Sequence, residues 1–102
     1  MEFKNSDIGI YTISETALSE IAAIATKNVK NVYPVKKDNS FVECKINKQN
    51  EPIIKISVRV KQGIDIVKLC NKIQDDVREN ILLMTSLDVK KINIDIQGFV
   101  TK

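Results

Sequence analysis

The region from Ile53 to Gly98 has a hydrophobic pattern that changes period twice. Its first part alternates apolar and polar residues, which is typical of a strand with one buried face, and the apolar members are Ile54, Ile56, Val58 and Val60. After Gly63 the apolar residues recur every three or four positions, as on one face of a helix of about 20 residues; they are Ile66, Cys70, Ile73, Val77, Ile81 and Met84. A turn over Thr85–Asp88 follows, and Ile92, Ile94 and Ile96 alternate again. The pattern predicts strand, helix and strand.

The N-terminal half predicts a second helix and two further strands. Residues Ile8–Ile13 alternate weakly, which indicates a short strand, and Ser14 is a good N-cap for the helix that follows. The buried stripe of this helix is expected to be Leu18, Ile21, Ala22, Ala25 and Val29. Asn31 is expected to end the helix, since asparagine tolerates the left-handed conformation. Phe41–Asn47 then predicts a strand, with Val42, Cys44 and Ile46 inward, that forms an antiparallel hairpin with Ile53–Lys61.

These elements predict an α+β fold in the order β-α-β-β-α-β. Because each strand has one apolar and one polar face, both helices are expected on one face of a mostly antiparallel sheet. This is the ferredoxin-like, split β-α-β plan. We expect one domain over residues 1–102, with flexible ends at 1–7 and 99–102.

The residue types argue against catalysis. The chain has no histidine, which removes the usual general base and the usual metal ligand. Its three glycines, Gly9, Gly63 and Gly98, are too far apart to form a phosphate-binding loop. Gln74, beside the buried Ile73, is expected to hydrogen-bond a neighbouring loop. We therefore expect no catalytic residue, no metal site and no cofactor.

The cysteines and the apolar runs predict a cytoplasmic protein. Cys44 and Cys70 have neither disulfide-framework nor C-x-x-C spacing, and unpaired thiols suit a reducing compartment. The longest apolar runs are far shorter than the ~20 residues that span a bilayer. We expect association with a membrane only through a partner.

The polar face of the predicted sheet is a candidate interaction face. By strand parity it carries five basic residues against the acidic Glu43 and Asp95, in a chain of net charge +3. The basic residues are Lys45, Lys55, Arg59, Lys61 and Lys91. Nucleic-acid binding would also need aromatic side chains for base stacking, and only Phe41 and Phe99, at strand ends, are expected to reach this face. Protein contact is therefore the favoured interpretation, and nucleic-acid binding is the alternative.

Three motifs in order resemble the alkaline shock (general stress) protein family. The opening motif is Gly9, Ile13, Ser14, Ile21, Ala22, Ala25 and Val32. The central motif is Ile54–Val60 with Gly63, Ile66, Gln74, Val77 and Ile81. The closing motif is Met84, Thr85, Leu87, Val89, Ile92, Asn93, Ile94, Ile96 and Gly98. The chain departs from the family at Ser86 and Asn31, where glycine is frequent, and at Gln62, where an aromatic residue is frequent.

The resemblance implies a non-enzymatic cytoplasmic protein linked to cell-envelope stress. It implies partner proteins, in some members membrane-anchored, and self-assembly in others. We expect contacts through the sheet edge and the basic face, because an edge strand has unpaired backbone groups. A further alternative is a carrier or sensor of a small acyl ligand. It is suggested by the isoleucine-rich interior and by the fatty-acid kinase-like gene neighbours of shorter family members.

Overall fold

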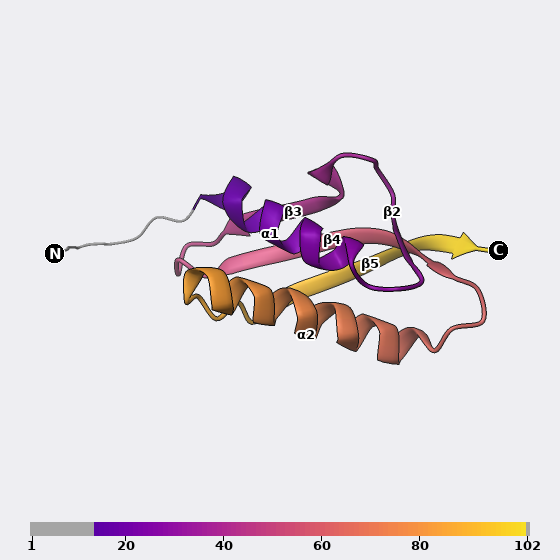
Figure 1. The fold of residues 1–102 in the computed structure, drawn as a ribbon. Coiled ribbons are helices and arrows are strands. Elements are labelled where there is room, and N and C mark those ends of the chain that lie inside the picture. Colours follow the sequence, from indigo (N-terminus) through magenta and orange to yellow (C-terminus); the bar gives the residue numbers. More distant parts are fainter. Residues whose placement is uncertain (1–13, 102) are drawn as a thin grey trace, which may run out of the picture.

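The computed structural model describes residues 14–101 and shows an α+β fold, as predicted (Figure 1). The expected strand at Ile8–Ile13 lies outside the described residues. The elements are α1 (Glu15–Lys27), β2 (Val32–Pro34), a short 3-10 helix η1 (Asn39–Phe41), β3 (Val42–Ile46), β4 (Pro52–Lys61), α2 (Ile66–Thr85) and β5 (Lys91–Val100). Both helices lie on one face of a mostly antiparallel four-stranded sheet.

Strand β4 is the centre of the sheet. Along one side it pairs with β5 in parallel, from Ile53 opposite Lys91 to Lys61 opposite Val100. Its other side is shared, because β3 pairs with the first half and β2 with the second, both antiparallel. The predicted β3–β4 hairpin is thus confirmed. The strands β4 and β5 are direct neighbours joined by α2, so no strand lies between the two members of this β-α-β unit. The α+β class is confirmed, but the predicted split β-α-β plan, which needs a strand between the two, was wrong for this pair.

Helix α1 is shorter than expected. Ser14 caps its start, and the hydroxyl accepts a hydrogen bond from the Ala17 N–H at 3.0 Å. The helix ends at Lys27 with Asn28 as its C-cap, whereas the sequence placed the end at Asn31. Asn31 does adopt the predicted left-handed conformation, with φ of 69°, but it does so in the turn that leads into β2. Val29 is buried, as predicted, from a position after the helix.

Helix α2 confirms the central prediction, although the ends of its apolar stripe are not buried. Its buried residues are Leu69, Ile73, Val77 and Ile81. Cys70 is half-buried, while Ile66 and Met84 are 37% and 69% exposed. Both residues lie in terminal turns, Ile66 at the first position of the helix and Met84 one residue before its end. The expectation of burial was therefore wrong at Ile66 and Met84.

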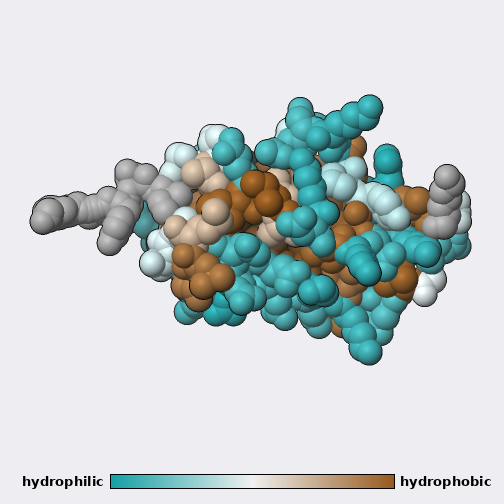
Figure 2. Space-filling model, in the orientation of Figure 1, coloured by the Kyte–Doolittle hydropathy of each residue, from teal (hydrophilic) through white to brown (hydrophobic). Residues whose placement is uncertain are grey.

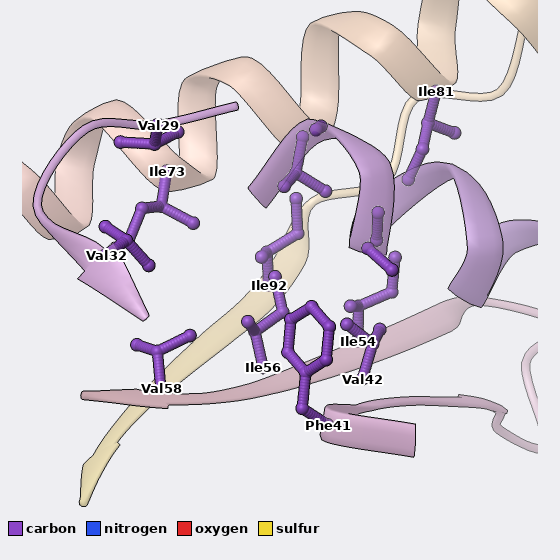
Figure 3. Close-up of a cluster of buried hydrophobic side chains, with 14 of the residues drawn as sticks. Val29, Val32, Phe41, Val42, Ile54, Ile56, Val58, Ile73, Ile81 and Ile92 are labelled. Atoms are coloured by element: carbon purple, nitrogen blue, oxygen red, sulfur yellow. The ribbon is translucent and has the colours of Figure 1, made fainter. Parts of the chain in front are cut away.

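The core lies between the helix layer and the inner face of β4. The inward residues Ile54, Ile56, Val58 and Val60 are all fully buried. Phe41 joins them at 2% exposure, and Figure 3 shows its ring beside Ile56. The Phe41 ring therefore packs in the core, whereas the sequence had allowed the ring to reach the polar face. The short helix η1 turns the ring inward before β3 begins.

Three strands differ from the expected pattern. Strand β2 was missed, since a three-residue segment that contains Pro34 has no readable alternation. Strand β5 was expected to end at Gly98 but continues to Val100, because its last residues pair with the end of β4. Ile46 was expected to be buried but is 40% exposed, at the end of β3 where the hairpin loop begins.

Candidate interaction surface

The face of the sheet opposite the helices, here called the outer face, carries the five predicted basic residues. Register places Lys45, Ile53 and Lys91 in one row and Glu43, Lys55 and Asn93 in the next. Ser57 and Asp95 follow, then Tyr33, Arg59 and Gly98, and finally Lys61 opposite Val100. The structure therefore brings all five to one face but spreads them along its length.

The two ends of the outer face differ electrostatically. Lys91 lies 3.5 Å from the Glu51 carboxylate, so part of its charge is neutralised. Hydrogen bonding from Asn47, followed by the charge of Lys91, lowers the pKa of Glu51. At the opposite end, no carboxylate within residues 14–101 forms an ion pair with Arg59 or Lys61. Positive charge is therefore least compensated at the C-terminal end of β4.

Tyr33 is a member of the outer face that sequence reasoning missed. It lies directly opposite Arg59 in the antiparallel β2–β4 pair and is 41% exposed. Opposed residues in such a pair have Cβ atoms about 5 Å apart. Three residues around a proline do not reveal which strand they pair with, so the register was needed to find this aromatic side chain.

Arg59 leans towards β5, where its side chain lies over Gly98. A register shift between Val58 and Arg59 places Gly98 across from Arg59. A Cβ on Gly98 would stand 3.8 Å from Cδ and 3.9 Å from Cγ of Arg59, so the arginine stem lies over the glycine. The guanidinium is thus directed to one side of β4, while Tyr33 lies on the other.

A hollow of about 230 Å³ opens on the outer face beside Ser57. It forms where β2 and β3, which share one side of β4, separate. Its lining is mostly polar and includes two lysines and one glutamate: Val35, Lys36, Ser40, Phe41, Glu43, Lys55, Ser57 and Gln97.

A second hollow of about 350 Å³ lies at the other end of the molecule, between the β3–β4 hairpin and the α2–β5 connection. It is lined by Asn50, Glu51, Pro52, Leu87, Asp88, Lys90 and Lys91. No core isoleucine lines either hollow, so neither of them favours the acyl-carrier alternative.

Within residues 14–101, strand β5 has one edge without a neighbouring strand, here called the open edge. It pairs only with β4 among the described strands. Gln74 covers part of this edge, since its Nε2 donates to the Ile92 carbonyl oxygen at 2.7 Å. The Ile92 carbonyl therefore points away from β4. The N–H and C=O of one strand residue point to the same side, and alternate residues point the same way, so the backbone groups of Ile94 and Ile96 also point away from β4. The sequence led us to expect that Gln74 would bond a neighbouring loop, whereas its partner belongs to a strand.

The helix layer has exposed apolar side chains. Ile24 is 59%, Leu83 77% and Met84 69% exposed, and Figure 2 shows apolar surface over α1 and over the C-terminal end of α2. No helix within the described part of the chain is both long and apolar enough to cross a membrane.

The two cysteines of the chain lie within the described residues, and burial disfavours the thiolate form of both. Cys44 and Cys70 are both free, and burial raises the pKa of each thiol, which disfavours the nucleophilic thiolate. Between residues 14 and 101, no three His, Cys, Asp or Glu side chains gather as a metal site would require.

Comparisons with known proteins agree on family and fold. The sequence profile of the alkaline shock protein family, described as having a cell envelope-related function, matches residues 3–101. The uncharacterized protein YqhY of Bacillus subtilis (strain 168) is 27% identical over 111 residues, which cover 96% of this chain and 82% of YqhY.

Among solved structures, the chain resembles part of Era, crystallised in complex with MgGDPNP and nucleotides 1506-1542 of 16S ribosomal RNA. The TM-score is 0.50 at 13% identity, and the match covers 100% of this chain but 37% of the Era chain. At this identity the likeness concerns the fold alone.

Proposed function

Because the chain belongs to the alkaline shock protein family, whose function is related to the cell envelope, we propose that it is a non-enzymatic interaction protein that binds partner proteins through the open edge of β5. It would act in the cytoplasm and reach the membrane through a membrane-anchored partner. A second copy of the chain is a further candidate for the same edge.

The single observation that carries this proposal is the open edge itself. An unpaired strand edge is a template for an added strand, because its N–H and C=O groups lack partners. Gln74 occupies this edge only at Ile92, and the remaining residues to Val100 have no described strand beside them. The exposed Phe99, at 53%, offers an apolar contact at the end of the same strand.

The test is to remove one outward N–H from the edge. Ile94→Pro deletes the N–H that faces away from β4, and proline is tolerated at such edge positions. Ile94→Val keeps the N–H and is the matched control. We expect the wild type and Ile94→Val, captured from native cells by affinity tag, to retain the same envelope-associated partner or to self-associate in light scattering. Ile94→Pro should lose the partner or the self-association that the wild type shows.

Two results would contradict the proposal. One is a wild-type protein that stays a monomer and retains no partner. The other is an Ile94→Pro variant that is folded, as judged by circular dichroism, and that retains the partner as well as the wild type does.

The acyl-carrier alternative stays a prediction. It would be supported by a lipid that copurifies with the native protein and is identified by mass spectrometry.

A further inference from the structure

We propose that the outer face of the sheet binds single-stranded nucleic acid around Tyr33. The site, here called the Tyr33 site, consists of Tyr33, Lys36, Lys55, Ser57, Arg59 and Lys61. It lies on the face of the sheet, whereas the partner-binding proposal concerns the backbone edge of β5, so either one can fail without the other.

The first requirement for such a ligand is a base-stacking platform. Every base has a π-face, so one exposed aromatic ring can hold a base without reading its sequence. Tyr33 provides that ring, since it is 41% exposed and projects from the outer face opposite Arg59. From the sequence, only two aromatic rings were expected to reach this face, Phe41 and Phe99 at strand ends, and Tyr33 was not identified.

The second requirement is a track of positive charge for the phosphates. Lys55, Arg59 and Lys61 lie on the same side of β4, at two- and four-residue intervals. With about 6.6 Å for each two residues of strand, the track is roughly 20 Å long. No ion pair with a carboxylate of residues 14–101 neutralises any of the three.

The third feature is the hollow beside Ser57, next along β4 from the Tyr33 row. At about 230 Å³ it has room for a nucleobase or a phosphate next to the base stacked on Tyr33. Lys36 and Lys55 offer cationic donors there, and Ser57 and Gln97 offer neutral hydrogen-bonding groups. Glu43 also lines the hollow, directly opposite Lys55, and opposes an anion on that side. This favours placing the phosphates along Lys36, Arg59 and Lys61.

The experiment measures fluorescence anisotropy of a fluorescein-labelled 12-nucleotide uridine RNA titrated with the full chain. Tyr33→Ala should weaken binding about five- to 150-fold, the usual effect of losing one stacked base. Tyr33→Phe keeps the ring and should bind within about twofold of the wild type. Arg59→Gln should weaken binding and make the salt dependence shallower by roughly one phosphate contact.

The matched charge control is Lys68→Gln. Lys68 is exposed on α2, in the helix layer on the opposite side of the sheet, and its removal changes net charge as Arg59→Gln does. We expect affinity within about twofold of the wild type. If Tyr33→Ala fails to fold by circular dichroism, the comparison of Arg59→Gln with Lys68→Gln carries the test.

Three outcomes would overturn the proposal. The first is a wild type that binds no RNA at 50 mM salt with ~100 μM protein. The second is a folded Tyr33→Ala variant that binds as the wild type does, and the third is a Lys68→Gln variant weakened as much as Arg59→Gln. A competition experiment tests acidic protein segments as the alternative ligand. If polyglutamate displaces the labelled RNA as well as unlabelled RNA of equal charge does, the face binds acidic protein segments and this proposal is also overturned.

Discussion

At the scale of single residues, Asn31 and Ser86 are two of the three non-glycine residues within 14–101 that have left-handed backbone. Asn31 has φ of 69° and Ser86 has φ of 63°. Ser86 ends α2, and its N–H donates to the Leu82 carbonyl oxygen at 2.9 Å. These are two of the positions where the family resemblance led us to expect glycine. A non-glycine residue at such φ is strained, and asparagine tolerates it better than serine does.

Ser86→Gly is expected to raise the free energy of unfolding by about 0.5 to 1 kcal/mol. Glycine removes the Cβ strain at positive φ, and the greater entropy of the unfolded chain offsets part of the gain. Urea denaturation followed by circular dichroism measures the change. Asn31→Gly is the comparison and should gain less, because asparagine already accepts this conformation. A loss of stability in Ser86→Gly would show that the serine side chain supports the turn.

At the scale of elements, α2 is tied to β5 by side chains as well as by packing. The Arg78 guanidinium holds Asp88 through two hydrogen bonds, Nε to Oδ1 at 2.6 Å and an Nη to Oδ2 at 3.0 Å. Asp88 lies in the connection between the helix and the strand. Gln74 makes a second tie further along β5. Together these contacts hold the connecting segment and the start of β5 against the middle of the helix.

The Arg78–Asp88 pair predicts a pH-dependent contribution to stability. Hydrogen bonding from Arg78 lowers the pKa of Asp88 below its ordinary value. A carboxylate with a lowered pKa in the folded state stabilises at a pH above its unfolded pKa of about 4. The contribution is lost as pH falls through the folded pKa. The stability difference between wild type and Asp88→Asn should therefore be constant near neutral pH and shrink in acid.

Urea denaturation at several pH values measures that difference. Glu79→Gln is the control, since it removes a carboxylate of α2 that forms no ion pair within residues 14–101. At neutral pH it should lower the free energy of unfolding less than Asp88→Asn does. A wild-type advantage over Asp88→Asn that grows as pH falls would contradict the assignment.

At the scale of the whole molecule, stability depends on one aliphatic core centred on β4. Ile56 is fully buried between the helix layer and the neighbours of β4, with Val42 of β3 on one side and Ile94 of β5 on the other. In a core of closely packed branched side chains, a deleted side chain leaves a cavity that its neighbours fill only in part.

Ile56→Ala should lower the free energy of unfolding by about 2 to 5 kcal/mol, through lost burial and the cavity left behind. This is a large share of the total of about 5 to 15 kcal/mol expected for a small domain. Ile53 is half-buried on the outer face of the same strand, so Ile53→Ala should lower the free energy of unfolding by less. Thermal and urea denaturation measure both, and equal losses would argue against a core confined to the helix side of the sheet.

The sequence by itself determined the periodic elements and their faces. Alternation over residues 53–61 and the three-to-four spacing over 66–84 are local properties of the chain, since side-chain direction follows from the backbone period. That is why α2, the buried face of β4 and the outer face with Lys45, Lys55, Arg59, Lys61 and Lys91 were all predicted before any contact was known.

Only the tertiary structure decided which segments lie beside one another. Tyr33 lies opposite Arg59 because the short β2 pairs with the half of β4 that β3 leaves free. The Phe41 ring points into the core because η1 turns it inward. Met84 stayed exposed since nothing among the described residues covers the last turn of α2. Pairing, register and cover depend on residues distant in the chain, so no local period contains them.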